Sequence, residues 1–253
     1  MNSQDPRTRE LAERLAQVKE RIHAAQQGST APTLIVVTKF HPAADVLRLR
    51  SLGVCDVGEN RDQEAAAKAT EVGAIDAHQL RWHFIGQLQK NKAKSVAAYA
   101  HSVQSIDRGS LVTALGNAMV RQQDATGREA LECFIQVDLS GAYPDLALAP
   151  QPDGPSHSGR GGATPSSIAQ LAAQIAQASG LRLAGLMAVA PLGVAPEPGF
   201  SLLGELSAKL VSEHPEATSI SSGMSHDLEA ALLAGATHLR VGSDILGPRP
   251  LVR

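Results

Sequence analysis

Short apolar runs rich in β-branched residues alternate with helical patterns along most of the chain, and this alternation constrains the fold more than any other feature. A buried strand followed by a crossover helix is the unit from which parallel sheets are built. The alternation predicts strands over 34–38, 54–57, 82–85, 102–106, 131–139, 183–189, 217–220 and 238–241. The spacing of apolar residues predicts helices over 5–27, 43–52, 61–72, 88–99, 108–123, 167–179, 200–213 and 226–235.

Eight strand-and-crossover units in 253 residues match the number and the length of a (β/α)8 barrel. We therefore predict an α/β fold, a single TIM-type barrel domain over residues 1–253 with an extra N-terminal helix. The last strand is followed by little chain, so we expect the eighth helix to be short or missing and the first helix to cover the gap. A doubly wound open sheet is the alternative, although no GxGxxG motif follows the first strand.

One segment, residues 141–166, interrupts the alternation. It is dense in Pro, Gly and Ser, which favour loops over packed elements. The same alternation resumes after it, so we predict a flexible surface loop inserted into the barrel domain, and not a linker between two domains.

The composition excludes several classes of function. Hydrophobic residues make up 43% and charged residues 19%, which is enough for a sizeable core, and the formal net charge is -2. That charge and an aromatic content of 3% give no indication of a nucleic-acid partner. No apolar run is long enough to span a membrane. Cys55 and Cys133 each lie in an apolar run, so we expect both to be small buried hydrophobes in a cytoplasmic protein.

Lys39 directly follows the first predicted strand, and Pro42 then begins a loop. Parallel barrels place their active sites at the carboxyl ends of the strands. Burial and nearby cations lower the pKa of a lysine at such a place, and the free amine can then form a Schiff base with an aldehyde. A surface lysine just after a strand is the alternative when this stretch is considered alone.

Two small, hydroxyl-bearing turns follow the seventh and eighth strands. They are Ser222-Gly223-Met224-Ser225 and Gly242-Ser243. Barrels often bind phosphate at this place, whereas a plain serine N-cap beside a turn glycine is the alternative for the first turn alone. Arg240, in an otherwise apolar strand, is either directed into the mouth of the barrel or part of a buried ion pair.

A reactive lysine beside a phosphate site favours an aldehyde that carries a phosphate, and pyridoxal 5'-phosphate (PLP) is such a molecule. Its ring nitrogen needs a protein partner, and Arg240 can be that partner. Because a guanidinium can only donate, the ring nitrogen would stay unprotonated, and the cofactor would withdraw electrons weakly.

These motifs resemble those of the YggS/PROSC family of pyridoxal phosphate homeostasis proteins, which look like the barrel domain of bacterial alanine racemase. The resemblance rests on VVTKFHP (36–42), GENRDQE (58–64), WHFIGQLQKNK (82–92), GLMAVAP (185–191), SSGMSHDLEAAL (221–232) and HLRVGSDILGPR (238–249). The resemblance implies that Lys39 carries the Schiff base and that Arg240 faces the ring nitrogen. It also implies two groups of cofactor-binding residues, one around the phosphate (Ser222, Gly223, Met224, Ser225, Gly242 and Ser243) and one lining the ring (Asn60, His83 and Met187).

The resemblance further implies a protein without substrate turnover, which holds PLP, delivers it to PLP-requiring apo-enzymes and maintains intracellular vitamin B6 homeostasis. We expect a monomer. The chain departs from the family pattern in its long 141–166 segment and in the two serines before Gly223.

Two other functions stay open from the sequence. A single-domain amino-acid racemase would need a tyrosine base, which alanine racemases take from a second domain that we do not expect here. Tyr99 and Tyr143 are the two tyrosines of the chain, and Tyr143 is the candidate. A phosphosugar isomerase or aldolase would use the same lysine and the same phosphate site.

Overall fold

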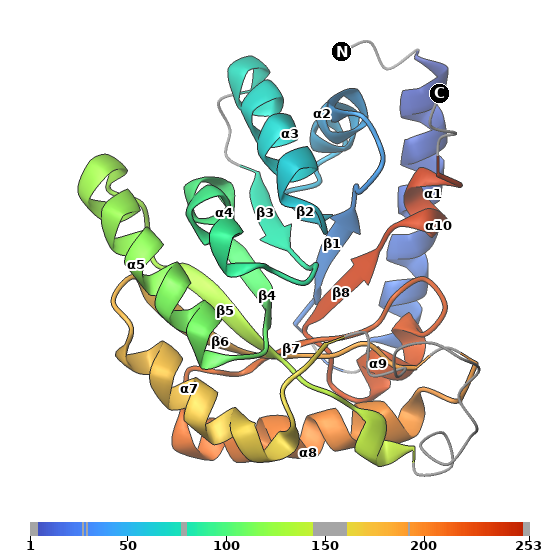
Figure 1. Ribbon diagram of the computed structural model, residues 1–253. Coiled ribbons are helices and arrows are strands. Elements are labelled where there is room, and N and C mark those ends of the chain that lie inside the picture. The colour runs from blue at the N-terminus through green and yellow to red at the C-terminus, as the bar shows by residue number, and fades with distance from the viewer. Residues whose placement is uncertain are drawn as a thin grey trace, which may run out of the picture.

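Eight parallel strands close into a barrel in chain order, which confirms the predicted (β/α)8 fold and excludes the open sheet (Figure 1). The structure is a computed structural model that describes residues 5–26, 28, 30–76, 80–143, 161–191 and 193–249. The strands are β1 (Thr33–Val37), β2 (Asp56–Glu59), β3 (Arg81–Phe84), β4 (Ser102–Ile106), β5 (Leu131–Gln136), β6 (Leu181–Met187), β7 (Ser219–Ser221) and β8 (His238–Val241).

Helices surround the barrel (Figure 1). They are α1 (Pro6–Ala25), α2 (Ala43–Ser51), α3 (Asp62–Ile75), α4 (Ala93–Tyr99), α5 (Gly109–Thr126), α7 (Ile168–Gln177), α8 (Glu197–Glu213), α9 (Leu228–Leu233) and α10 (Ser243–Leu246), with 3-10 turns at Lys90–Lys92, Ser140–Ala142 and Pro165–Ser167. None of the helices in the described ranges is long and apolar enough to cross a membrane.

The N-terminal helix takes the place of a full eighth helix, as predicted. α10 has only four residues, and α1 lies beside it and β8 (Figure 1). Asp5 caps α1 by accepting a hydrogen bond from the backbone N–H of Thr8. Arg7 donates to the Leu246 carbonyl at 2.9 Å, and Arg21 pairs with Asp244 at 2.7 Å. These contacts fix α1 to α10, the helix that follows β8.

The second strand begins at Asp56, two residues later than predicted. The expected burial of Cys55 is also wrong. Residue 54 still belongs to the turn after α2, because its N–H donates to the Leu49 carbonyl at 3.0 Å. Cys55 is therefore exposed at the amino end of the barrel, whereas Cys133 on β5 is fully buried, as expected. Both thiols are free, and burial raises the pKa of Cys133 to about 12.

Most of the segment predicted as a loop, residues 144–160, lies outside the described residues. Its described end is tied to the sheet. Ala163 forms a parallel bridge with Val137, and its N–H donates to the Gln136 carbonyl at 2.7 Å. The helix predicted over 88–99 is also shorter than expected, because residues 90–92 form a 3-10 turn and the α-helix begins at Ala93.

Outward-facing strand residues pack against the helices and form the two large hydrophobic clusters of the molecule. Inside the barrel, Phe134, Ala184 and Met187 form a small apolar cluster. The ring of His238 packs edge-to-face against Phe134, with 5.3 Å between the ring centroids. Buried polar side chains, among them His83, Gln104 and Arg240, occupy part of the interior that branched apolar residues normally fill in a barrel.

We expect His238 to make the barrel sensitive to acid. Burial, with a smaller contribution from His83, lowers the pKa of His238 from 6.5 to about 4. A histidine whose pKa is depressed in the folded state binds its proton more readily in the unfolded chain. Stability should therefore fall as the pH decreases from 6.5 to 4, by at most about 3 kcal/mol from this residue.

The test is urea unfolding across this pH range for the natural protein and for His238→Phe, which keeps a ring against Phe134 but cannot titrate. The variant should lose less stability than the natural protein. An equal loss in both would show that His238 does not bind its proton preferentially in the unfolded state.

Candidate functional site

The carboxyl ends of β1, β6, β7 and β8 meet at one mouth of the barrel. In the register of the sheet, Ile35 lies opposite Arg240, and Met187 lies opposite Ser221. Gly242 is packed so closely on β1 that an added Cβ would lie 3.2 Å from the Val37 carbonyl oxygen. Lys39, two residues after Val37, is thereby brought close to the turn that follows β8.

Lys39 lies in a tight turn that directly follows β1. The Thr38 carbonyl accepts the N–H of His41 at 3.0 Å, which closes four residues into a turn. Phe40, the third residue, has a φ of 69° and is the one non-glycine with positive φ in the described ranges. This conformation costs a side-chain-bearing residue about 1–2 kcal/mol, and such strain is typical of functional sites.

Neighbouring charged groups hold Phe40 in that conformation. Its N–H donates to the Glu64 carboxylate at 2.5 Å. The guanidinium carbons of Arg61 and Arg249 lie 5.1 and 4.7 Å from the centre of its ring, within the range of cation–π attraction. The turn that presents Lys39 is therefore fixed by its surroundings.

A buried lysine, Lys68 on α3, also stabilises this turn. The Lys68 ammonium donates to the Thr38 carbonyl at 2.8 Å, to Glu59 at 2.8 Å and to Glu64 at 2.6 Å. Glu59 also accepts the Thr38 hydroxyl at 2.7 Å. The sequence analysis missed Lys68, although its spacing of four residues from Glu64 on a predicted helix is a recognisable ion-pair signal.

The Lys39 amine differs from Lys68 in its environment. It is partly buried and makes no hydrogen bond or ion pair within the part of the chain that the structure describes. Its pKa is lowered by burial and, to a smaller extent, by the positive charge of Arg249, while Glu59 opposes the shift. A larger fraction of this amine is therefore unprotonated at neutral pH than in an ordinary lysine.

The two predicted hydroxyl-bearing turns come together. The Ser225 and Ser243 hydroxyl oxygens lie 3.2 Å apart. Gly223 has a φ of 85°, and a Cβ there would lie 2.7 Å from the Ala231 Cβ, so only glycine fits. The hydroxyl of Ser222 is buried without a partner among the described residues. Met224 donates its N–H to the Asp227 carboxylate at 2.5 Å, which holds the first turn in shape.

Arg240, for which the sequence left two alternatives open, is only 4% exposed. Its guanidinium donates to the Ser221 hydroxyl at 2.6 Å and to the Ala188 carbonyl at 2.7 Å. No carboxylate of the described residues forms an ion pair with it, so the structural ion pair is excluded there. Burial lowers its pKa to about 10, which still leaves the guanidinium charged at neutral pH.

The three residues expected around a ring lie at different depths. Asn60 follows β2 at the mouth, and its carbonyl oxygen Oδ1 is buried without a partner in the described structure. The backbone of Asn60 packs directly against Gly86, where an added Cβ would lie 2.2 Å from the Asn60 backbone oxygen. Met187 is buried beside Phe134. His83 lies deeper, and both its ring nitrogens bond to residues inside the barrel.

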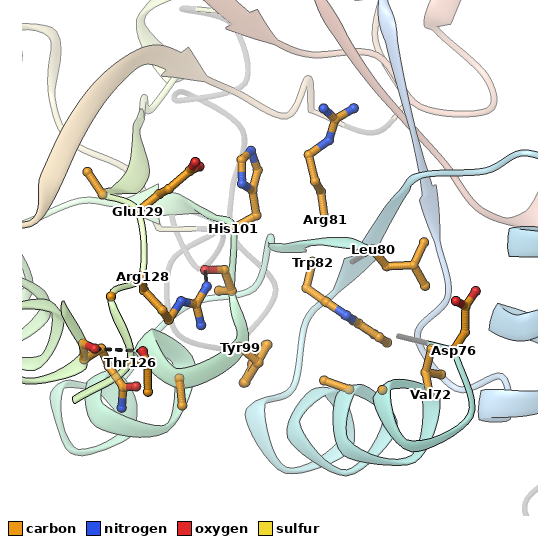
Figure 2. A pocket seen from close by; sticks show the side chains of 17 residues that line it. Val72, Asp76, Leu80, Arg81, Trp82, Tyr99, His101, Thr126, Arg128 and Glu129 are labelled. Carbon is orange, nitrogen blue, oxygen red and sulfur yellow. Dashed lines mark hydrogen bonds between the residues drawn. The ribbon is translucent and has the colours of Figure 1, made fainter. Parts of the chain in front are cut away.

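A cavity of about 660 Å³ lies away from this mouth, at the amino ends of β3 and β4 (Figure 2). Trp82, Tyr99, Arg81 and Arg128 contribute to its walls. The two arginines are already engaged, Arg81 with Asp56 and Arg128 with backbone carbonyls at the end of α4. The candidate site is therefore the mouth around Lys39, and not this cavity.

Residues 13–250 match the model of a protein family described as alanine racemase, N-terminal domain. A pyridoxal phosphate homeostasis protein of Corynebacterium glutamicum is 41% identical over 231 residues, which cover 90% of this chain and 95% of the relative. One from Mycobacterium tuberculosis H37Rv is 38% identical over 257 residues, which cover 97% and 95%. The chain belongs to the pyridoxal phosphate homeostasis protein family.

Solved structures agree with this family membership. PipY of Synechococcus elongatus PCC7942, solved with PLP bound, has a TM-score of 0.74 and 29% sequence identity, and the match covers 94% of this chain and all of PipY. Alanine racemase of Corynebacterium glutamicum has a TM-score of 0.66 at 11% identity, over 94% of this chain and 60% of the racemase. That second likeness shows a shared barrel fold.

Replacing Arg249 should make Lys39 less reactive. In Arg249→Met the nearby positive charge is lost, so the pKa of Lys39 should rise and its acylation near neutral pH should slow by roughly two- to fivefold, as expected for a partly screened charge pair. The measurement is the pH dependence of acylation at Lys39, followed by peptide mass spectrometry. Arg61→Met is the matched control, since Arg61 also stacks on Phe40 but does not contribute to the pKa shift. An equal effect of both variants would assign the role to the stack and not to the charge of Arg249.

Proposed function

We propose that the chain binds PLP as a Schiff base on Lys39 and holds the cofactor for delivery, which maintains the intracellular PLP and vitamin B6 level. The Lys39 amine carries this proposal. It follows β1 at the mouth of the barrel, on a strained turn, and its pKa is lowered by burial and by Arg249. A lysine with these properties is a nucleophile toward aldehydes. The names of the relatives and the PLP-bound structure of PipY support the choice of cofactor.

The side chains at the mouth fit the phosphate end of PLP. A phosphate accepts hydrogen bonds, and the Ser225 and Ser243 hydroxyls lie together as donors. The buried, unpartnered hydroxyl of Ser222 is a third donor. Gly223 and Gly242 have no side chain that would keep the phosphate away from the backbone, and Met224 completes the first turn. We propose that these six residues surround the phosphate.

Other residues fit the ring. The unpartnered Asn60 Oδ1 directly follows β2, and the Met187 side chain is at the end of β6. We propose that Asn60, Met187 and His83 line the ring and that Arg240 donates to its nitrogen. When bound, PLP supplies an aldehyde to the lysine and a ring that withdraws electrons. Because Arg240 remains charged and can only donate, it keeps that nitrogen unprotonated, and the withdrawal stays weak.

Both tyrosines are committed elsewhere, which argues against the racemase alternative. The Tyr143 hydroxyl donates to the Ala195 carbonyl at 3.0 Å and accepts the Gly199 N–H at 3.1 Å. Tyr99 contacts Asp62 and lines the cavity at the amino end. Burial raises the pKa of both phenols, so neither is poised as a base. We therefore propose a carrier without turnover, with PLP-requiring apo-enzymes as recipients, and a monomeric cytoplasmic protein.

Lys39→Ala should abolish covalent attachment of PLP. Borohydride reduction of the PLP-loaded natural protein, followed by peptide mapping, should place the pyridoxyl group on Lys39 and nowhere else. The visible colour of the Schiff base should be absent from the variant, whereas an aldolase barrel would be colourless throughout. Lys90→Ala, which removes an exposed lysine after β3, is the control and should label normally. Labelling of another lysine in the natural protein would contradict the assignment.

The double variant Ser225→Ala, Ser243→Ala should bind PLP about ten- to a hundredfold more weakly, since each substitution removes a hydrogen bond to a charged acceptor. Its affinity for pyridoxal, which lacks the phosphate, should be unchanged. Fluorescence titration with both compounds measures the difference, and Ser110→Ala with Ser201→Ala, two exposed serines, is the control. A loss of affinity for pyridoxal alone would place the phosphate elsewhere.

The PLP-loaded protein should restore the activity of a PLP-requiring apo-enzyme but should not racemise L-alanine. Racemisation needs a base on each face of the substrate, and loss of one such base typically costs 10²–10⁴-fold. A chiral assay of alanine beside a reconstitution assay measures both. Racemisation at roughly 1 s⁻¹ or faster that disappears in Tyr143→Phe would overturn the carrier proposal.

A further inference from the structure

Polar side chains form a continuous line through the interior of the barrel, from Arg240 near the mouth to Asp56 near the amino end. Arg240 Nη1 lies 2.6 Å from the Ser221 hydroxyl, and that hydroxyl lies 2.8 Å from Gln104 Oε1. Gln104 Nε2 lies 3.4 Å from His83 Nδ1, and His83 Nε2 lies 2.8 Å from Asp56 Oδ1. Arg240 comes from β8, and the other four residues come from β7, β4, β3 and β2 in that order along the line. All five side chains are buried, with Arg240 at 4% and Gln104 and Ser221 at 0% exposure.

The chemistry of the donors gives this line a single direction. A guanidinium can only donate, so Ser221 accepts from Arg240. Its own hydroxyl proton must then go to Gln104, since no other acceptor is bonded to it within the described part of the chain. Gln104 therefore directs its carbonyl toward Ser221 and its NH₂ group toward His83. The amide orientation is fixed from the arginine end.

The same argument fixes the proton of His83. Its Nε2 lies 2.8 Å from the Asp56 carboxylate, which can only accept. In the neutral ring Nδ1 is then the acceptor, facing the Ser102 hydroxyl at 2.7 Å and the NH₂ group of Gln104 at 3.4 Å. The proton is then on Nε2, which donates to Asp56. Burial lowers the pKa of His83 and favours this neutral form, while Asp56 and Glu132 oppose the shift and His101 reinforces it.

Protonation of His83 would break the line. The Ser102 hydroxyl at 2.7 Å could accept a proton on Nδ1, but the NH₂ group of Gln104 would lose its acceptor. If the amide turned instead, Ser221 would receive donors from both Arg240 and Gln104, and its hydroxyl proton would have no acceptor. A buried polar group without a partner costs about 1–3 kcal/mol. The neutral, Nε2-protonated His83 is therefore part of what holds Arg240.

Asp56 anchors the line at the other end of the barrel. It accepts two hydrogen bonds from Arg81, at 2.7 and 2.6 Å, in addition to that from His83. Burial alone would raise the pKa of Asp56, but the bonds from His83 and Arg81 outweigh it and lower the pKa to about 2. Arg81 reaches the wall of the cavity at the amino end (Figure 2). The anchor is thus a carboxylate that stays ionised.

We propose that Ser221, Gln104 and His83 are positioning residues for Arg240, forming a one-directional hydrogen-bond chain that ends on Asp56 and holds the guanidinium in one orientation beneath the mouth. Polar networks in a barrel core are tolerated only when every member is satisfied, and here they orient a buried cation that forms no ion pair in the described structure. The effect of the chain on the cofactor rests on the proposed function, whereas the chain itself does not.

The first experiment uses the protein without PLP. Nitrogen NMR of the side chains should show separate, hindered guanidinium N–H signals for Arg240, assigned by their loss in Arg240→Lys, and the pattern of a neutral His83 with its proton on Nε2. In Ser221→Ala and in Gln104→Leu the Arg240 signals should average into one. Ser221→Thr keeps a hydroxyl at this position and should therefore keep the separate signals. Ser105→Ala is the matched control, because Ser105 is equally buried on β4 but lies outside the chain.

Hindered Arg240 signals that persist in Ser221→Ala and Gln104→Leu, or a proton on Nδ1 of His83, would overturn the proposal. Should Ser221→Ala fail to fold, Gln104→Leu gives the same readout from a different strand. Since this experiment needs no cofactor, failure of PLP binding would sink the proposed function and leave the chain intact.

The second experiment uses PLP labelled with ¹⁵N in its ring. In the natural protein the ring nitrogen should give the shift of an unprotonated nitrogen that accepts a hydrogen bond. In Ser221→Ala that shift should move toward the value of free PLP, and the dissociation constant should rise about tenfold, the usual effect of one lost hydrogen bond to a charged group. Ser105→Ala should change neither. An unchanged nitrogen shift in a variant whose Arg240 signals average would show that the chain does not act on the cofactor.

Discussion

Pairing between β1 and β8 closes the barrel, and the candidate site depends on that closure. Four successive residues of β1, from Thr33 to Val36, lie in register with the four residues of β8. This register brings the turn after β1 beside the turn after β8, although their residues are about two hundred positions apart in the chain. A slip of one residue would turn every side chain to the opposite face of the sheet. Lys39 and Arg240 could not then serve the same mouth.

Two buried cations near this mouth are stabilised in opposite ways. Lys68 is surrounded by two carboxylates and a carbonyl, so its charge is neutralised and it serves to fix a turn. Arg240 bonds to a hydroxyl and a carbonyl, both neutral. A buried charge without a counter-charge is costly, and such groups cluster at functional sites. The contrast favours a structural role for Lys68 and supports the proposed binding role of Arg240.

The sequence predicts the barrel well because each unit shows its own period. The apolar run before Lys39 and the helical spacing of residues 5–27 are local signals, and both elements form close to the predicted positions. The start of β2 was less predictable, because Val54 has the composition of a strand but its N–H completes the turn after α2. Cys55 was misplaced for the same reason.

Much of the site depends on contacts between distant parts of the chain, which a local pattern does not contain. Lys39, Ser225 and Ser243 could be singled out because polar residues follow predicted strands. The left-handed conformation of Phe40 and its two stacked arginines had no local signal. Gln104 and Ser221 did leave a trace, as polar residues within buried strands, but only the three-dimensional structure shows that they join Arg240 to His83.

A crystal structure of the chain grown with PLP tests the central claim most directly. The account predicts continuous density from the Lys39 Nζ to the cofactor, the phosphate within hydrogen-bonding distance of the Ser225 and Ser243 hydroxyls, and the ring nitrogen beside Arg240. A cofactor bound elsewhere, or bound at this mouth with Lys39 unattached and the phosphate directed toward Arg240, would contradict it.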